Sequence, residues 1–117
     1  MRPEIRATRL ETLASKPMDR TEASRLADLL KALGNPTRLR IISALDTACV
    51  PVGSIVAATG LRQPTVSHHL RILRDQGVVR AERRGTYVYY CAANDALRLA
   101  IEELRILNGT RFDHGAT

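Results

Sequence analysis

Hydrogen-bonding and cationic side chains are concentrated in the middle of this chain of 117 residues. Between positions 62 and 90 it carries six arginines against one aspartate and one glutamate. An arginine-rich codon preference would also give 16 arginines and two lysines overall, so the position of the charges is more informative than their number. Guanidinium groups bind phosphates and base edges, and Ser67 and His68, near Arg71, add hydroxyl and imidazole groups. This chemistry indicates a polyanionic partner.

The two cysteines, Cys49 and Cys91, are the second group of side chains with chemical potential. They are too few and too far apart in sequence to be the framework of a secreted disulfide-rich domain. Two thiols can bind a soft metal ion or metalloid, or can be oxidised to a disulfide. Neither cysteine has a cationic neighbour or a CxxC partner, which favours the alternative interpretation that both are small buried apolar residues.

Two helices joined by a turn of a few residues are predicted to position the polar face. The first ends at Gly60, and Pro64 opens the second, where its missing N–H does no harm. The second helix has an apolar stripe at helical spacing, made of Val66, Leu70 and Leu73. Because an α-helix turns by 100° per residue, Ser67, His68 and Arg71 lie opposite this stripe. The arrangement is a helix-turn-helix, whose second helix fits the major groove of DNA.

Two further helices are predicted before this unit. Asp19 and Glu22 form a capping box at the start of the first, and Gly34 ends it. Asn35 and Pro36 begin the second, as N-cap and first helical residue. The apolar stripes are Leu26, Leu29, Leu30 and Leu33 in the first helix, and Leu39, Ile42 and Leu45 in the second.

A β-hairpin is predicted directly after the helix-turn-helix. Its strands are two β-branched or aromatic runs, Val78–Glu82 and Thr86–Cys91. A tight turn of Arg83, Arg84 and Gly85 joins them, with the glycine at positive φ. Residues 49–52 form a third β-prone segment, which Pro51 confines to a sheet edge. The hairpin therefore carries guanidinium groups at its tip.

A last helix is predicted between Asn94, as N-cap, and Gly109. Its apolar residues recur at spacings of four and three: Leu97, Ile101, Leu104 and Leu107. In so small a domain this stripe packs either on the core of the same chain or on a second subunit. The complete order, α-α-(β)-α-α-β-β-α, is a winged helix-turn-helix, mostly α with a small β-hairpin wing.

Three segments of the chain resemble the ArsR/SmtB family of bacterial repressors. They are LGNPTRLRI at Leu33–Ile41, QPTVSHHL at Gln63–Leu70, and YVYY at Tyr87–Tyr90 following Gly85. The resemblance covers roughly residues 24–107. It implies a homodimer paired through its first and last helices, bound to double-stranded operator DNA. It also implies release of the operator when an inducer binds or a thiol is modified.

The DNA-contacting positions implied by the resemblance fall on both the second helix of the helix-turn-helix and the wing. They are Gln63, Thr65, Ser67, His68 and Arg71 on the helix, and Arg83, Arg84 and Tyr87 on the wing. The helical periodicity independently places Ser67, His68 and Arg71 on the outward face. His69 lies on the flank of the buried stripe, and we predict a packed or hydrogen-bonding structural role for it.

The metal sites associated with the family are missing from this sequence. The Cys-x-Cys positions of its third helix fall here on Pro51 and Gly53, and residues 94–111 contain no histidine for a zinc site on the last helix. Cys49 and Cys91 remain, and in a winged helix the segment of Cys49 commonly lies beside the second wing strand. This pattern predicts a repressor that responds to a thiol-reactive or soft-metal(loid) signal such as As(III), with no required cofactor. The alternative is a regulator without cysteine sensing, controlled by another ligand or a partner protein.

An enzyme is not expected from these residues. The chain shows no Gly-rich phosphate loop, and the adjacent Glu102 and Glu103 point about 100° apart on a helix. Charges at the N-terminus and the lack of an apolar run of about 20 residues predict a cytoplasmic protein without a membrane partner. We predict an N-terminal extension at 1–18 that could add a short helix at the dimer interface, a DNA-binding and dimerisation domain at 19–109, and a tail at 110–117.

Overall fold

The computed structural model describes residues 16–45 and 49–115, with side chains as far as residue 111. The helices are α2 (Arg20–Leu33), α3 (Pro36–Ser43), α4 (Val52–Thr59), α5 (Gln63–Asp75) and α6 (Asp95–Gly115), and the strands are β1 (Val50–Pro51), β2 (Val79–Arg84) and β3 (Tyr87–Ala92). This order confirms the predicted winged helix-turn-helix. The extension predicted at 1–18 lies almost wholly outside the described residues. No helix in the described part is both long and apolar enough to cross a bilayer.

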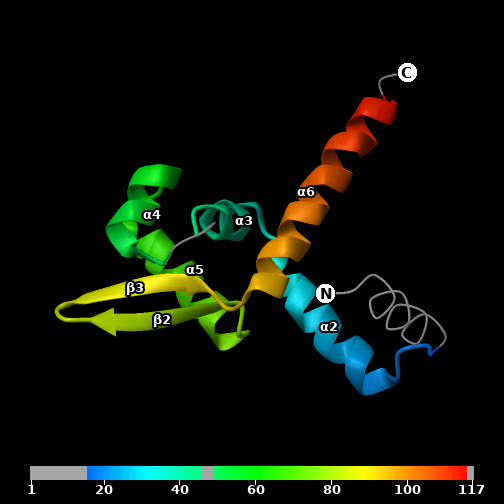
Figure 1. Cartoon of the computed structure of the whole chain (residues 1–117), viewed down its shortest axis with the longest axis horizontal. Helices are drawn as coiled ribbons and strands as arrows, with labels where there is room; N and C mark the ends of the chain where they lie inside the picture. Colours follow the sequence, from blue (N-terminus) through cyan, green and yellow to red (C-terminus); the bar gives the residue numbers. More distant parts are fainter. Residues whose placement is uncertain (1–15, 46–48, 116–117) are drawn as a thin grey trace, which may run out of the picture.

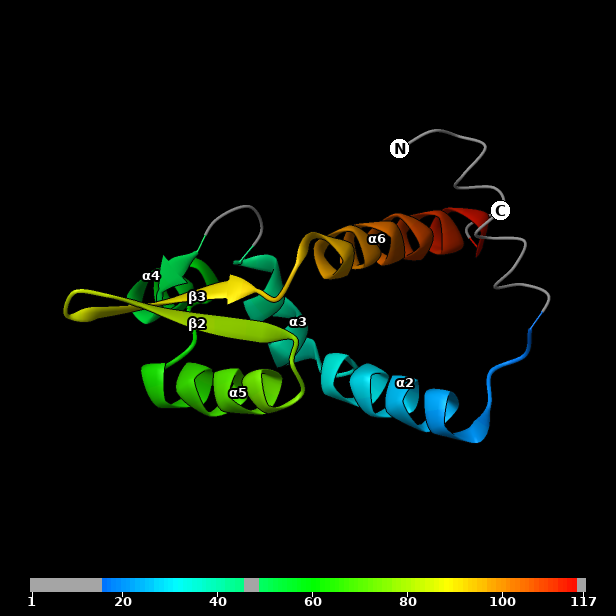
Figure 2. The same cartoon turned by 60° about the horizontal axis from the view of Figure 1, so that its bottom comes forward.

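The molecule has two ends with different surfaces (Figure 1). The β2–β3 hairpin projects from one side of a body formed by α3, α4 and α5, and α2 and α6 extend from the other side. Figure 2 shows α5 running along one face of the hairpin. The predicted recognition helix and wing are therefore held together, away from the two terminal helices.

Side-chain caps fix the starts of three helices as the sequence predicted. The N–H of Glu22 donates to Asp19 Oδ1 (2.8 Å), and the N–H of Leu97 donates to Asn94 Oδ1 (2.9 Å). Asn35 accepts in the same way at the start of α3. The predicted end of the last helix at Gly109 is wrong, because α6 continues to Gly115. A glycine inside a helix costs about 1 kcal/mol without ending it, and no proline follows in the sequence.

The core lies between α3, α4, α5 and the base of the hairpin. Its buried residues are Leu33, Ile41, Ile42, Leu45, Ile55, Val66, Leu70, Leu73, Val78 and Val79. The predicted inward stripe of α5 is confirmed, since all three of its residues are fully buried. The stripe predicted for α3 is partly wrong: Ile41 is fully buried, while Leu39 is 42% exposed. Leu39 instead lines a groove that α3 shares with α2 and α6.

The three strands form an antiparallel sheet in the order β1-β3-β2, with β1 at the edge as Pro51 predicts. The hairpin turn differs from the predicted one. Arg84 pairs with Tyr87, so the turn is Gly85 and Thr86, and both predicted turn arginines belong to β2. Gly85 has φ of 64°, and a glycine in the first position of a two-residue turn matches the twist of the strands.

Candidate nucleic-acid interface and the adjoining disulfide

The angle between α4 and α5 is fixed by hydrogen bonds at the turn that joins them. Gly60 ends α4 with φ of 72°. The buried Thr59 hydroxyl donates to the carbonyl of Ile55 (2.7 Å) and accepts the N–H of Leu61 (3.3 Å). The Arg40 guanidinium donates to the Thr59 carbonyl. Carbonyls at a helix end lack intrahelical partners, and the Arg40 bond satisfies one of them. Together these bonds hold the turn in one conformation, which sets where α5 begins.

The outward face of α5 is polar and exposed along its length. It carries Gln63, Thr65, Ser67, His68 and Arg71, all of which are exposed. No side chain caps the start of α5. Its first-turn N–H groups are therefore available to an external acceptor such as a phosphate. Helix dimensions, exposed hydrogen-bonding groups and one cation together suit the major groove of duplex DNA.

His69 lies at the edge of this face and is half-buried. Its Nδ1 lies 3.5 Å from Arg38 Nη1, and its ring meets that of His68 edge to face at 5.1 Å between centroids. Burial lowers the pKa of His69 below its ordinary value, and the charge of Arg38 and the neighbouring His68 lower it further. The half-buried ring beside Arg38 is packed and within hydrogen-bonding distance of a guanidinium, the kind of environment that a structural histidine has.

The wing presents arginines on both faces of the hairpin. Alternation along β2 puts Arg84 on the face that includes Arg80 and Glu82, and it puts Arg83 on the opposite face. Arg83 and Arg84 are exposed, and Tyr87 is 65% exposed. The structure thus holds the three residues proposed for wing contacts at the accessible end of the hairpin.

Glu82 holds the arginines on its own face of the wing. Its Oε2 lies 2.7 Å from Arg84 Nη2, and its Oε1 lies 3.1 Å from Arg80 Nη1. The Arg84 guanidinium also lies over the ring of Tyr89, 4.7 Å from its centroid. Hydrogen bonds from Arg84 and then Arg80 are the main reasons that the pKa of Glu82 lies below its ordinary value.

Cys49 and Cys91 are joined by a disulfide with a Cα–Cα distance of 4.3 Å. The segment of Cys49 therefore lies beside the second wing strand, as it commonly does in a winged helix. The pairing of Val50 with Tyr90 in the β1–β3 ladder explains the contact, because one further step along it sets Cys49 opposite Cys91. Cys91 is buried and Cys49 is half-buried. The bond ties the edge strand that precedes the helix-turn-helix to the second strand of the wing.

Glu82 also adjoins the disulfide, a contact that was not predicted from the sequence. Its Oε2 lies 3.9 Å from Cys91 Sγ. The two sulfurs and a Glu82 oxygen lie within 4.8 Å of one another, which makes these residues a candidate set of metal ligands. The signal was present in the sequence: a two-residue turn at Gly85 and Thr86 makes Glu82 a diagonal neighbour of Cys91 on one face.

Exposed apolar side chains gather on α2 and α6. They include Leu26, Leu30, Leu99, Leu104, Ile106 and Leu107. A groove of about 530 Å³ lies between these helices and α3, with Leu30, Leu39 and Leu104 among its lining residues. Contiguous apolar surface of this kind is typical of a protein–protein contact.

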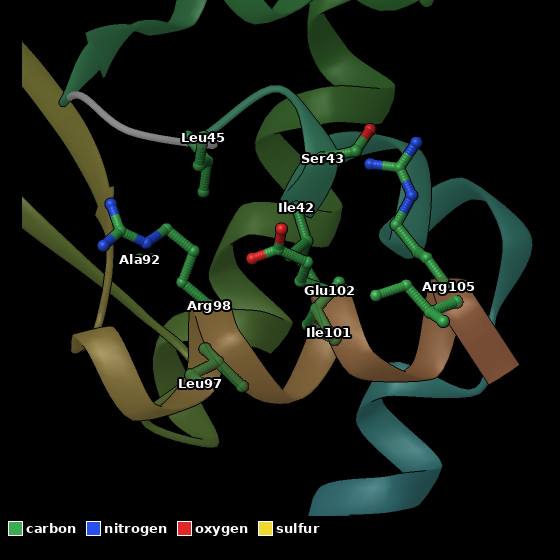
Figure 3. A pocket seen from close by; sticks show the side chains of 10 residues that line it. Ile42, Ser43, Leu45, Ala92, Leu97, Arg98, Ile101, Glu102 and Arg105 are labelled. Atoms are coloured by element: carbon green, nitrogen blue, oxygen red, sulfur yellow. The ribbon is translucent and has the colours of Figure 1, made fainter.

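A second cavity, of about 390 Å³, lies between α3 and α6. Figure 3 shows Glu102 between Arg98 and Arg105 on α6. Ile42 of α3 and Leu45, in the turn that follows α3, contribute to its apolar lining. Arg98 is paired with Asp95 at 3.1 Å. The cavity combines apolar walls with charged groups of both signs, as small-molecule sites commonly do.

Known proteins match this chain over the same elements. The model of the ArsR family of bacterial regulatory proteins matches residues 35–81. The transcriptional regulator NmtR of Mycobacterium tuberculosis is 40% identical over 76 residues, which are 65% of this chain and 63% of NmtR, so the match spans less than two thirds of that protein. The biofilm growth-associated repressor of Agrobacterium fabrum is 35% identical over 103 residues, which cover 80% of this chain and 88% of that protein.

A solved structure agrees with the fold. The homodimeric winged helix-turn-helix DNA-binding domain of Mb0332 from Mycobacterium bovis, a possible ArsR-family regulator, superposes with a TM-score of 0.74. It shares 31% sequence identity, and the match covers 84% of this chain and 93% of that one. The similarity therefore extends beyond residues 35–81, the region matched by the family model.

Proposed function

Because the chain belongs to the ArsR family of bacterial regulatory proteins, we propose that it is a homodimeric repressor that releases its operator when Cys49 and Cys91 react. Membership makes it a DNA-binding transcriptional regulator and not an enzyme. The dimer, the DNA contacts, the repressing action and the signal are the parts that we propose. The disulfide between the edge strand and the wing is the observation that carries the sensing step.

Sequence readout is assigned to α5. The exposed hydroxyl of Ser67 and imidazole of His68 can exchange hydrogen bonds with base edges, and Arg71 can reach a base or a phosphate. Gln63 and Thr65 stand at the helix start, where side chains meet base edges or the backbone. Arg83, Arg84 and Tyr87 of the wing bind phosphate and sugar groups, which hold the protein on the duplex without reading its sequence.

Pairing of two chains is assigned to α2 and α6. The exposed leucines of both helices and the groove between them support this assignment. A second copy that covers these side chains would set two α5 helices on successive turns of one face of the duplex. The homodimeric Mb0332 domain, which has the same fold, is consistent with such an arrangement.

The proposed reactions of Cys49 and Cys91 need no cofactor. With peroxide, one thiol is oxidised to a sulfenic acid with loss of water, and the second thiol displaces a second water to form the disulfide. Arsenite would instead condense with both thiols, release two waters and bridge the two sulfurs. Either product restrains the base of β3 against β1, and the wing then no longer follows the DNA backbone as it does in the reduced protein.

Operator release by thiol reagents tests this proposal. A binding site is first selected from random duplexes, and the reduced protein is then titrated on it. We expect affinity to fall by about 10³–10⁵-fold between 50 and 200 mM salt if the dimer makes 6–10 phosphate contacts. Peroxide, a persulfide donor or arsenite should release the wild type but not Cys49→Ser or Cys91→Ser. Unchanged release of both variants would exclude the two thiols as the sensor.

The cavity between α3 and α6 favours one alternative, a regulator controlled by another ligand. Arg98, Glu102 and Arg105 at an apolar cavity suit a small polar or zwitterionic molecule. In that case Glu102→Gln would abolish release by the ligand, while both cysteine variants would respond normally. The matched control is Glu103→Gln, which removes the adjacent charge of α6 without touching the cavity lining.

A further inference from the structure

Glu82 lies between the sulfur pair and the arginines of the wing, and it contacts Cys91 and Arg84 with the same oxygen atom. Its Oε2 lies 2.7 Å from Arg84 Nη2 and 3.9 Å from Cys91 Sγ. In the disulfide neither sulfur carries a proton, so the carboxylate is held by the guanidinium groups. Reduction of the disulfide gives two free thiols. Together with the Glu82 carboxylate, these thiols can bind a cation.

The reduced sulfurs and Glu82 form a mixed sulfur and oxygen donor set. Their ligand atoms already lie within 4.8 Å of one another. Zinc binds thiolate sulfur at about 2.3 Å and carboxylate oxygen at about 2.0–2.2 Å, usually with four ligands. Three protein ligands and a water therefore suit Zn²⁺ or Cd²⁺. The oxygen donor distinguishes this site from a pair of thiols alone, which is what a bridging arsenic atom would use.

We infer that Cys49, Cys91 and Glu82 bind one Zn²⁺-class cation in the reduced protein, and that Glu82 must leave Arg84 to do so. The inference rests on the proposed availability of the two thiols, but not on which signal releases the operator. Binding converts two thiols to thiolates and releases two protons, and the cation accepts electron pairs from both sulfurs and from the carboxylate. No oxidant or reductant takes part in this step.

Competition for one carboxylate links the cation to the wing. Arg84 loses its hydrogen-bond acceptor when the cation takes Glu82, and its guanidinium becomes free to bind a phosphate. By thermodynamic reciprocity, a phosphate that binds Arg84 favours the cation to the same extent. A cation bound by both sulfurs also restrains β3 against β1, as arsenic or the disulfide would, and it differs from them in freeing Arg84 from Glu82. Oxidation to the disulfide removes the cation and returns Arg84 to Glu82.

Cadmium binding to the reduced protein in the absence of DNA tests the site directly. Charge-transfer absorption from sulfur to cadmium reports the thiolates, and competition with a chromogenic chelator gives the affinity. We expect one Cd²⁺ per chain, with the absorption lost in Cys49→Ser and Cys91→Ser. Glu82→Gln should keep the absorption and weaken binding by about tenfold or more. Glu82→Asp, which keeps the carboxylate, should bind more tightly than Glu82→Gln.

Two variants with the same change of charge test whether Arg84 and the cation compete for Glu82. Arg84→Met and Arg83→Met each remove one positive charge from the tip of β2, but Arg83 lies on the opposite face of the hairpin from Glu82. We expect Arg84→Met to bind Cd²⁺ several-fold more tightly than Arg83→Met, because only the former removes a guanidinium that competes with the cation for the carboxylate, while Arg80 stays in place in both variants. Equal affinities of the two variants would overturn the competition, and an unchanged affinity of Glu82→Gln would overturn the ligand assignment.

The failures of the two proposals can be told apart. If the reduced wild type binds no Cd²⁺ but peroxide still releases the operator, the cation site is wrong and the thiol sensor stands. If Cd²⁺ binds through Glu82 but neither cysteine variant alters operator release, the cation site stands and the proposed thiol sensor is wrong.

Discussion

The helix α5 and the wing lie side by side (Figure 2) and both carry exposed arginines, but these arginines are held differently. Arg71 on α5 belongs to none of the ion pairs found among the described residues. Arg80 and Arg84 on the wing are both bound by Glu82. In the proposed DNA complex, Arg71 breaks no internal ion pair, whereas Arg80 and Arg84 must first exchange the Glu82 carboxylate for a phosphate.

The two regions are also anchored by different means. Val66, Leu70 and Leu73 hold α5 in the core. The sheet that carries the wing is tied to its edge strand by a covalent bond that reducing agents can break. Burial does not respond to a chemical signal under native conditions, but a disulfide and an exposed ion pair do. In the proposed mechanism, sequence readout by α5 is therefore constant and the wing is the regulated part.

The largest expected effect comes from the anchor of α5. Leu70→Ala removes a side chain that is 1% exposed, and we expect it to lower the free energy of unfolding by about 2–5 kcal/mol. Urea denaturation followed by circular dichroism measures the loss, which should be similar in the oxidised and reduced protein. A loss below about 1 kcal/mol would show that core burial is not what holds the recognition helix.

Reduction of the disulfide is expected to cause the second-largest loss of unfolding free energy. The bond closes a loop of 42 residues, for which chain entropy gives about 4 kcal/mol. We therefore expect the wild type to lose up to about this much unfolding free energy on addition of a reductant. Cys91→Ser should be insensitive to the reductant, and equal stability of oxidised and reduced wild type would mean that the bond does not constrain the unfolded chain.

The contrast between α5 and the wing also separates what the sequence could predict from what it could not. Helix starts at Asp19, Asn35 and Asn94 were predictable because capping depends on residues three apart. The stripe of α5 was predictable because helical periodicity is local. The wing contacts depend on strand register: a turn at Arg83–Gly85 would set Glu82 opposite Thr86, and Cys91 would then fall on the other face. The actual turn, at Gly85 and Thr86, sets Glu82 opposite Tyr89.

The burial of Leu39 in α3 and the end of α6 differ from the predictions for a related reason. Leu39 has the spacing of a core residue, yet it lines the groove between α3 and the terminal helices. Gly109 has the type of a helix end, yet it lies inside α6. In both cases the outcome depends on surfaces formed by distant parts of the chain, or by a second chain, which residue type and local spacing do not specify. The predicted boundaries at 18/19 and 109/110 remain predictions.

Base-specific readout gives the next prediction. His68→Ala should lower affinity for the preferred operator by about 1–3 kcal/mol and relax the choice at one base position of each half-site. Arg84→Ala should instead weaken all duplexes about equally and reduce the salt slope by about one for each phosphate that the protein no longer binds. Binding of a panel of single-base operator variants at several salt concentrations distinguishes them. Equal losses on every sequence for His68→Ala would contradict the assignment of readout to α5.

The smallest expected effect is the pH dependence of the ion pairs that Glu82 forms with Arg84 and Arg80. It also reports directly on the carboxylate that holds these arginines. The pKa of Glu82 is lowered from 4.5, first by the hydrogen bond from Arg84 and then by that from Arg80. Because the folded pKa lies below the unfolded one, the pair contributes its stabilisation above pH 4.5, and this is lost as pH falls through the lowered value.

An NMR titration of the Glu82 carboxyl group follows this step in the folded protein. We expect its midpoint to lie below 4.5 in the wild type and to rise toward that value in Arg84→Met, by more than in Arg80→Met. The order follows from the shorter contact, 2.7 Å to Arg84 against 3.1 Å to Arg80. An unmoved midpoint in Arg84→Met would mean that Glu82 does not hold that guanidinium, and the wing would then be as freely available to DNA as α5.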